Sequence, residues 1–329
     1  MEKKRETSFD ILRVIAMIMV IIIHVSNVYS RSFGIISNKS YFISLCFNTI
    51  SRISVPIFLM ISGALLLNRE FEWKSYSKRI LKYLLLILVW DSIYLIWEYF
   101  YLGITYDKLY RLLLNPYRAH LWFLYTIIVL YAIQPLLRKI LLKIGKRLKI
   151  LLLLGWLSIF SISMLNTTLA SFLTIFSYIG YFILGKYLYD FSKEKDLRKY
   201  NYLFLIIILL STSLSILLNY LFSIKYQMFY NFFFAYRTPF IITSSISFYL
   251  FVLSNYKKDT CSKIINILSN CSLGVYLIHG IFLDITVSKF VYQNHNSLIG
   301  IPFFSFMTLI SSVVIVFLLK KIKGIKNLL

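Results

Sequence analysis

The sequence predicts an all-helical integral membrane protein, a bundle of about ten transmembrane helices in a single domain over residues 1–329. Three observations predict this class. The chain is 59% hydrophobic and 18% aromatic, with a mean hydropathy of +0.75, which is more apolar surface than a soluble core of this size can bury. Its apolar runs are repeatedly long enough to cross a bilayer. Its Lys and Arg residues alternate between sparse and dense gaps along the chain.

The apolar runs define ten helices in order. The predicted ranges are 8–30, 41–67, 78–101, 119–138, 149–167, 169–190, 201–222, 234–255, 271–289 and 300–320. The longest connection between two of them runs from Leu102 to Arg118. No linker or soluble appendage is long enough for a second domain, so the whole chain is predicted to be one membrane domain.

The net charge of +23 would suggest a nucleic-acid partner in a soluble protein, but its distribution favours a membrane topology instead. Of the 36 Lys and Arg residues, 26 fall in alternate gaps, at 3–5, 69–82, 138–149, 186–199, 257–263 and 320–326. By the positive-inside rule, the N- and C-termini are both predicted to be cytoplasmic. The charges in the first helix and its lack of a small-x-small cleavage site favour an uncleaved helix retained from Met1 onward.

The cysteines give no sign of a structural cross-link or a metal site. Cys46, Cys261 and Cys271 show no CxxC or Cys/His spacing, so neither a disulfide framework nor a zinc site is indicated. The sequence also has no Walker or GxGxxG pattern. We therefore expect no metal and no nucleotide fold.

Three ionisable residues, Asp10, Arg13 and His24, interrupt the first apolar run. At about 100° per residue they share one helix face, and His24 lies roughly 16 Å further along the helix than Arg13. Ionisable groups in hydrocarbon are costly and indicate function, and imidazole is the side chain best suited to act as a base near neutral pH. His24 is the candidate catalytic residue, with a helix-packing hydrogen bond as the alternative. Arg13 and Asp10 could act with it or simply pair with each other.

A basic cluster formed by Lys78, Arg79 and Lys82 opens the third predicted helix. Spacings of three and four residues keep these cations on one side of the helix. Such a cluster suits an anionic cofactor with phosphates, although an ordinary cytoplasmic anchor has the same pattern. Arg52 and Asp91, near mid-membrane in the second and third predicted helices, have opposite charges and are expected to form a structural ion pair.

The remaining histidines and one arginine are weaker candidates. His120 and Trp122 lie at the outer entrance of the fourth predicted helix, where an interfacial aromatic belt is the alternative reading. Arg237, near the outer end of the eighth, either snorkels or faces an outward cavity. His279 is placed in the inner half of the ninth, and His295 in a solvated outer loop.

Taken in order, these residues resemble the membrane acyltransferase 3 family, whose members are O-acyltransferases of bacterial polysaccharides and other surface glycans. The resemblance covers nearly the full chain. The matching motifs are Arg13 and His24 with ten residues between them, SVPIFLMISGALLL, Arg79-Ile-Leu-Lys82, HLWFL with the later Tyr131 and Pro135, YRTPF, and GVYLIH ending at His279. The family pattern in the third helix is Arg-x-x-Arg, so Lys82 keeps the charge but lacks the bidentate fork. The chain is similar to short members without an SGNH-type esterase domain, such as enterobacterial common antigen O-acetyltransferase and the intercellular adhesin acyltransferases.

The resemblance implies transfer of an acyl group, most often acetyl, from cytoplasmic acyl-CoA to a hydroxyl of a cell-surface or lipid-linked glycan. It implies a multi-pass protein of the bacterial cell (cytoplasmic) membrane, with acetyl-CoA as donor, the lipid bilayer around it and polysaccharide-synthesis machinery as a partner. In this scheme Arg79, Lys82 and Lys78 hold the CoA phosphates. His24 deprotonates the acceptor hydroxyl or carries the acyl group, with Arg13 and Asp10 beside it. The implied substrate-binding residues are His120, Trp122, Arg237 and His279.

Two other classes of function fit a ten-helix bundle with an intramembrane polar stripe. One is a transporter or exporter of a glycan or its precursor, although no similar halves are evident and the basic cluster has no use in carrying a neutral sugar. The other is a ligand-sensing membrane domain that binds the acceptor without acyl-CoA. Dependence on acyl-CoA separates both from an enzyme.

Overall fold

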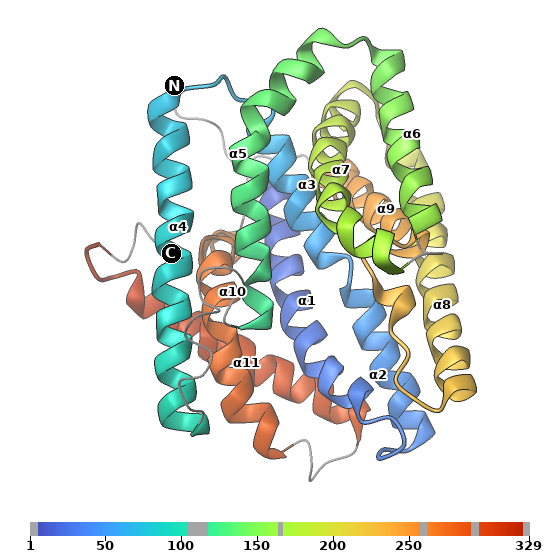
Figure 1. Cartoon of the computed structure of the whole chain (residues 1–329), viewed down its shortest axis with the longest axis vertical. Coiled ribbons are helices and arrows are strands. Elements are labelled where there is room, and N and C mark those ends of the chain that lie inside the picture. The colour runs from blue at the N-terminus through green and yellow to red at the C-terminus, as the bar shows by residue number, and fades with distance from the viewer. Residues whose placement is uncertain (1–5, 104–117, 164–166, 257–261, 291–295, 325–329) are drawn as a thin grey trace.

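A computed structural model describes residues 6–103, 118–163, 167–256, 262–290 and 296–324, and every regular element among them is helical (Figure 1). The α-helices are α1 (Thr7–Arg31), α2 (Asn38–Ser51), α3 (Ser54–Leu66), α4 (Trp73–Trp97), α5 (Trp122–Lys143), α6 (Lys146–Ser163), α7 (Thr167–Glu194), α8 (Asn201–Tyr226), α9 (Pro239–Asn255), α10 (Lys263–Phe290) and α11 (Ser297–Leu319). Short helical turns are η1 (Glu98–Leu102), η3 (Ala119–Leu121), η4 (Arg198–Tyr200) and η5 (Phe232–Phe234). Most of the long helices run side by side, and α11 crosses the bundle obliquely (Figure 1).

Among the described residues, 8 helical segments are long and apolar enough to cross a membrane. They are Thr7–Arg31, Asn38–Leu66, Trp73–Tyr101, Ala119–Lys143, Arg198–Tyr226, Phe232–Asn255, Lys263–Thr286 and Ser297–Leu319. These correspond to eight of the predicted spans, and the described residues have the all-helical class that the sequence predicts. The other two predicted spans, 149–167 and 169–190, fall on the helices α6 and α7, which are not among the eight. The count of ten and the cytoplasmic side stay predictions.

Two predicted helices begin earlier than their hydropathy suggests. The helix predicted from 78 begins at Trp73, so the basic cluster lies within its first turns rather than opening it. The helix predicted from 271 begins at Lys263, because the polar residues that precede Cys271 have partners inside the fold. Ser269, for example, donates a hydrogen bond to Asp10 on α1 (2.7 Å). About two turns of helix before Cys271 were therefore read as loop.

The second predicted span is broken into α2 and α3 at Arg52 and Ile53. Pro56 supplies the physical reason, since it has no backbone N–H and its ring conflicts with the carbonyl four residues earlier, which is that of Arg52. Arg52 N–H instead bonds back to the Thr49 carbonyl (3.1 Å), and Ile57 N–H starts the new helix on the Ile53 carbonyl (3.1 Å). The break places the Arg52 guanidinium within the span.

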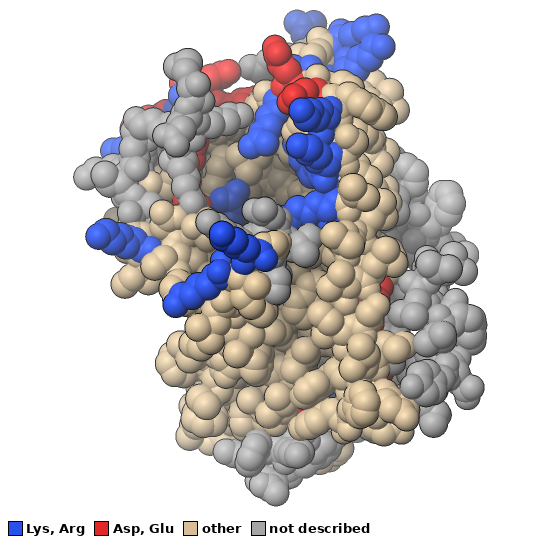
Figure 2. Space-filling model, turned by 90° about the vertical axis from the view of Figure 1, so that its left-hand side faces the viewer, with Lys and Arg blue, Asp and Glu red and all other residues tan. Residues whose placement is uncertain are grey.

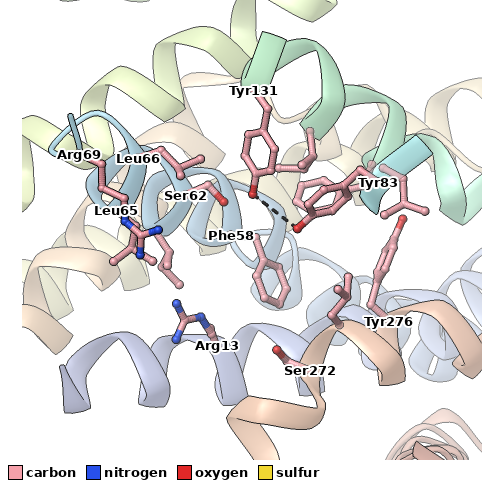
Figure 3. A pocket seen from close by; sticks show the side chains of 15 residues that line it. Arg13, Phe58, Ser62, Leu65, Leu66, Arg69, Tyr83, Tyr131, Ser272 and Tyr276 are labelled. Carbon is pink, nitrogen blue, oxygen red and sulfur yellow. Dashed lines mark hydrogen bonds between the residues drawn. The ribbon is translucent and has the colours of Figure 1, made fainter. Parts of the chain in front are cut away.

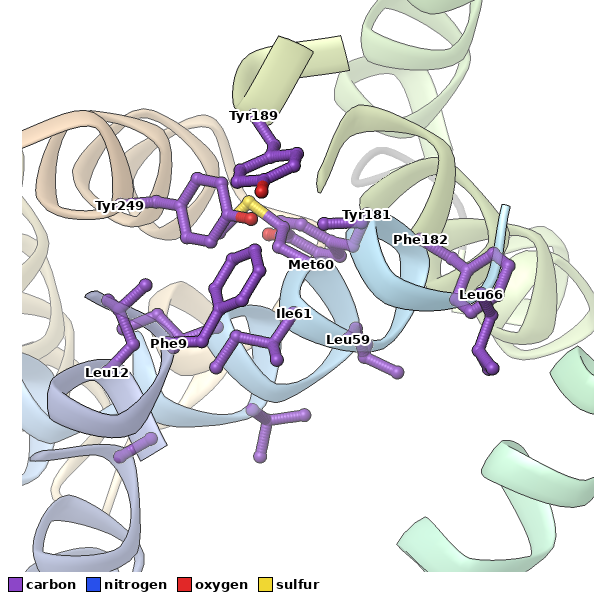
Figure 4. Packing of buried hydrophobic residues seen from close by; sticks show 14 of the residues in the cluster. Phe9, Leu12, Leu59, Met60, Ile61, Leu66, Tyr181, Phe182, Tyr189 and Tyr249 are labelled. Carbon is purple, nitrogen blue, oxygen red and sulfur yellow. The ribbon is translucent and has the colours of Figure 1, made fainter. Parts of the chain in front are cut away.

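Two glycines allow α3 and α7 to pack backbone against backbone. A Cβ on Gly63 would lie 1.7 Å from the Phe182 carbonyl oxygen, and one on Gly185 would lie 2.1 Å from the Met60 carbonyl oxygen. Small residues at a helix interface permit this approach within a membrane. Around the contact, Met60 meets Tyr181, Tyr189 and Tyr249 in a buried cluster that also takes in Phe9 of α1 (Figure 4).

Helix α1 is central, because it contacts α2, α3, α9, α10 and α11. Polar contacts hold it at both ends. Asp10 is bonded to α10 near one end, and the hydroxyls of Ser30 and Ser44 join α1 to α2 near the other (3.0 Å). These contacts fix the positions of Arg13 and His24 relative to the neighbouring helices.

Lys and Arg side chains gather at one end of the face shown in Figure 2, the end where α4 begins and α5 ends in Figure 1. Several of them surround a hollow, while the described residues on the opposite half of the face show almost no charged side chains (Figure 2). This distribution is what the alternation of basic gaps predicts for a membrane protein.

Candidate functional site

Three histidines from distant parts of the sequence meet in the interior. They are His24 on α1, His120 on η3 and His279 on α10. Ring centroids are 5.1 Å apart for His24 and His279, 4.8 Å for His120 and His279, and 6.0 Å for His24 and His120. His279 is completely buried and His120 is 8% exposed, whereas His24 is half-buried and lines a cavity. This grouping joins the predicted catalytic residue to two predicted substrate-binding residues.

The placement of His279 differs from the prediction, which put it in the inner half of its helix. Because α10 begins at Lys263, the residue lies past the helix midpoint and level with His24. Its Nδ1 lies 2.6 Å from the Tyr276 carbonyl oxygen and 3.2 Å from that of Val275. An Nδ1 between two carbonyls carries the proton, so Nε2 is the acceptor of the neutral ring. That Nε2 has no hydrogen-bond partner among the described residues.

His120 is held by its backbone and by close packing on α10. The Tyr276 hydroxyl donates a hydrogen bond to the His120 carbonyl. Gly280 leaves room for the ring, because a Cβ there would lie 2.8 Å from His120 Cε1 and 2.7 Å from the Tyr94 hydroxyl. Tyr94 is in turn fixed by its hydrogen bond to the Leu277 carbonyl (2.7 Å). The imidazole therefore has little freedom to move.

An ion-pair network ties together the three elements around His120. Arg118, two residues before the histidine, pairs with Glu98 of η1 (2.7 Å) and with Asp284 of α10. Trp97 Nε1 donates a second hydrogen bond to Asp284 (3.0 Å). The charged side chains are only 9–23% exposed, so the attraction is screened less than at a free surface. The network holds α4, η3 and α10 in register beside the histidines.

The cavity that His24 lines has a volume of about 320 Å³, and we call it the histidine cavity. Its walls also include His120, Trp122 and Arg52. A second cavity of about 290 Å³ is lined by Arg13 and Arg69, and we call it the arginine cavity. In Figure 3 the Arg13 guanidinium faces this space from α1 and that of Arg69 from the chain that follows α3, and the hydroxyls of Tyr83 and Tyr131 lie across from them.

One wall is common to the two cavities. Phe58 of α3, Phe123 of α5 and Tyr276 of α10 line both of them. Ring centroids are 6.1 Å apart for Phe58 and Phe123, and 5.7 Å for Phe123 and Tyr276. These three rings therefore form an aromatic wall shared by the arginine-lined and the histidine-lined space.

The predicted basic cluster lies beside the arginine cavity rather than in its lining. The Arg79 guanidinium carbon is 5.8 Å from the centre of the Tyr131 ring, which does line the cavity. Lys82 is half-buried and Lys78 is exposed. Their predicted role with CoA phosphates stays a prediction. Arg69, which lies between α3 and α4 and lines the cavity, was missed because its cluster was read as an anchor.

Asp10 and Arg13 are paired, as one of the two sequence readings expected. Asp10 is fully buried and accepts hydrogen bonds from Arg13 Nη1 (3.0 Å) and the Ser269 hydroxyl (2.7 Å). Arg13 nevertheless lines the arginine cavity. Asp10 thus orients the guanidinium and joins α1 to α10.

The predicted ion pair between Arg52 and Asp91 is wrong. Both residues are described, and each makes other contacts. Arg52 Nε donates to Asn48 Oδ1 (2.8 Å), and Asp91 accepts from the Tyr125 hydroxyl (2.8 Å). Arg52 lines the histidine cavity instead. A charge near mid-membrane indicates a functional site. The opposite charge of Asp91 on the next predicted helix suggested a structural ion pair instead, which was incorrect.

The other predicted residues divide between the cavity and its surroundings. Trp122 lines the histidine cavity together with Tyr236, the first residue of the YRTPF motif, and Tyr178, which the sequence did not single out. Arg237 is half-buried next to Tyr236 but is not part of that lining. His295 lies outside the described residues. Over the described part of the chain, no group of three or more His, Cys, Asp or Glu side chains is arranged to hold a metal ion.

Comparison with known proteins identifies the family. The acyltransferase domain of the acyltransferase 3 family matches residues 6–318, nearly the whole chain. No curated protein and no solved structure matches it. The match confirms the resemblance predicted from the motifs and favours an enzyme over a carrier or a sensor. With eight candidate membrane-spanning segments among its described residues, the chain belongs to the acyltransferase 3 family and is a membrane acyltransferase.

Proposed function

We propose that this acyltransferase moves an acetyl group from cytoplasmic acetyl-CoA to a hydroxyl of a glycan or lipid-linked saccharide on the other side of a bacterial cell membrane. The observation that carries the proposal is the pairing of two cavities across one aromatic wall. One has guanidinium groups suited to a phosphate-bearing donor, and the other has three imidazoles suited to activating a hydroxyl.

The donor enters at the arginine cavity. Arg13 and Arg69 line it, and Arg79 stands next to it over Tyr131. Guanidinium groups bind phosphate through charge-assisted, bidentate hydrogen bonds, which suits the phosphates of CoA. The hollow in Figure 2 lies at the end where Lys and Arg gather, and the positive-inside rule assigns that end to the cytoplasm, where acyl-CoA is available.

The reaction takes place near His24. A neutral imidazole nitrogen of His24 accepts the proton of the acceptor hydroxyl while the oxygen attacks the thioester carbonyl carbon. A new C–O bond forms, the C–S bond breaks, and the proton passes from the imidazolium to the departing CoA sulfur. In the alternative order His24 itself attacks the thioester and carries the acyl group before the acceptor arrives. Both orders need the thioester to reach the wall formed by Phe58, Phe123 and Tyr276.

His120 and His279 support this step through their position. Their Nε2 atoms have no hydrogen-bond partner among the described residues and lie in the same group of rings as His24. A neutral imidazole nitrogen can accept a hydrogen bond from the saccharide hydroxyl, or it can take over the proton from His24. The close packing of His120 on Gly280 keeps the two imidazoles near His24.

The proposal is tested by acyl transfer in membranes. Membranes with the wild-type chain or the His24→Ala variant receive radiolabelled acetyl-CoA and a surface-glycan extract, with expression matched by immunoblot. We expect label in glycan with wild type and a loss of about 100-fold or more with His24→Ala, the scale of general-base catalysis. His295→Ala is the matched histidine control and should keep full transfer. Equal labelling by wild type and a correctly inserted His24→Ala chain would overturn the proposal.

A further inference from the structure

The histidine cavity is positively charged and has no acidic side chain in its described lining. Arg31 and Arg52 line it, while no Asp or Glu does. A charge inside a membrane protein normally has an opposite charge or a polar cavity beside it, because an uncompensated one is costly. The lining therefore favours a ligand that supplies negative charge.

Arg52 is the deeper of the two arginines, and its contacts leave most of its donors for a ligand. Its Nε donates to Asn48, and its guanidinium carbon lies 5.1 Å from the Phe234 ring centre and 5.9 Å from that of Tyr236. Among the described residues no carboxylate pairs with it. A guanidinium has five N–H donors, so those on the two Nη atoms can bind a planar anion in the cavity.

The break between α2 and α3 explains how a charge comes to lie at this depth. Arg52 is the residue that follows α2, where the free carbonyls of a helix end favour a cation. Substrate sites in membrane proteins often form at such discontinuous helices, because the backbone opens only where it lines a cavity. The break thus serves to present Arg52 to the cavity rather than to lipid.

The rest of the wall suits a sugar. Trp122, Tyr178 and Tyr236 form an aromatic surface, with centroid separations of 5.2 Å for Trp122 and Tyr178 and 6.0 Å for Trp122 and Tyr236. Flat rings give the apolar face of a sugar a surface to pack on, and the amides of Asn27 and Asn231 can bond its hydroxyls. The volume of about 320 Å³ lies at the small end of ligand pockets, roughly 300–1,000 Å³.

We infer that the acceptor is an anionic saccharide, one sugar unit with a carboxylate or phosphate that pairs with Arg52 while a nearby hydroxyl faces His24. The inference rests on the proposed acyl transfer, since an acceptor has meaning only for a transferase. A fixed anion positions the sugar ring, so Arg52 acts in binding and selection of the acceptor rather than in the transfer step itself.

Binding is measured first, without reference to activity. The purified full chain in detergent is titrated with methyl β-D-glucuronide, α-D-glucose 1-phosphate and methyl β-D-glucoside at matched ionic strength, and tryptophan fluorescence is read. Trp122 in the wall is the reporter, and Trp122→Phe checks its share of the signal. We expect one of the two anionic sugars to bind about ten-fold more tightly than the neutral glucoside, the scale of one charge-assisted hydrogen bond.

The variants assign the selectivity to Arg52. Arg52→Gln should abolish the preference for the anionic sugar, and Arg52→Lys should keep part of it because the charge stays. Arg147→Gln, at an exposed arginine of α6, is the matched control and should bind like wild type. Which anionic sugar binds separates a carboxylate from a phosphate ligand. Equal binding of neutral and anionic sugars, binding of neither, or an unchanged preference in Arg52→Gln would overturn the inference.

A transfer assay separates this inference from the proposed function. Radiolabelled acetyl-CoA is supplied with the same sugars, and transfer is compared between wild type and Arg52→Gln. Loss of transfer to the anionic sugar alone supports the inference. An equal loss for both sugars means that Arg52 acts on the transition state, which overturns the inference and leaves the transferase intact. Selective binding of the anionic sugar without transfer to any acceptor overturns the transferase and leaves the ligand class intact.

Discussion

Gly280→Ala is expected to impair catalysis in a chain that still folds, because the added methyl group meets His120. The Cβ would lie 2.8 Å from His120 Cε1 and 2.7 Å from the Tyr94 hydroxyl oxygen. Tyr94 is fully buried and bonded to the Leu277 carbonyl, so it can yield only by losing that hydrogen bond. The imidazole of His120 must therefore take up most of the displacement.

The size of the effect follows from these distances. Carbon atoms in contact lie about 3.5–4.0 Å apart, so the His120 ring has to retreat by about 0.7 Å or more. A misplacement near 1 Å in an active site costs up to about 100-fold in rate, so we expect a loss of acyl transfer between about 10-fold and 100-fold. Overpacking costs about 1–3 kcal/mol, partly offset by about 0.5–1 kcal/mol from the better helix propensity of Ala.

The assay compares initial rates of label transfer from radiolabelled acetyl-CoA with unfolding midpoints of the same purified chains. Gly155→Ala in α6 is the matched control, since its Cβ meets no atom within 4 Å, and it should keep both rate and stability. Tyr94→Phe in the Gly280→Ala background removes one of the two clashes and should restore part of the rate. A correctly folded Gly280→Ala chain with wild-type transfer would refute the argument that His120 is positioned by packing on α10.

Three further predictions concern packing, the ion network and the donor site. Gly63→Ala should lower the unfolding midpoint in detergent by the equivalent of about 3 kcal/mol, because its Cβ would lie 1.7 Å from a carbonyl oxygen of α7; an unchanged midpoint would contradict the close contact. Asp284→Asn leaves Arg118 with one carboxylate and should cost about 1 kcal/mol, since the pair is partly exposed; differential scanning fluorimetry of the two chains measures it. Arg69→Ala, in the cavity lining, should raise the KM for acetyl-CoA by about ten-fold, while Lys78→Ala, outside the lining, leaves it within about two-fold; equal effects would place the phosphates elsewhere.

Sequence patterns predicted most of the fold because each membrane-spanning segment must meet the same requirements on its own. A span must be apolar and long enough, and both properties can be read locally. The break at Arg52 was also encoded, in Pro56, but the apolar run continues through it and hides the interruption. The early start of α10 was missed for the opposite reason, since Ser269 is polar and finds its partner on another helix.

The candidate site was predictable in its individual residues but not in their grouping. His24 and Arg13 stand out because ionisable side chains in an apolar helix are rare. His120 and His279 lie against His24 because of the way η3 and α10 pack. This packing cannot be predicted from the spacing of residues in the sequence. The incorrect pairing of Arg52 with Asp91 also arose because helix packing could not be predicted. An opposite charge on a neighbouring helix suggested a pair, while the actual surroundings of the guanidinium are set by the turn of the chain at the helix break.

The aromatic wall between the cavities meets a requirement that neither cavity meets alone. A path with polar, arginine-lined and histidine-lined spaces in one protein would conduct ions if it were open throughout, and apolar constrictions prevent this by excluding water. Phe58, Phe123 and Tyr276 come from three different helices and together line both cavities. Acyl-CoA is neutral and largely apolar at its thioester end, whereas the phosphates of its CoA part are charged. In the proposed reaction such a barrier would let the thioester end reach His24 while the phosphates stay with Arg13 and Arg69.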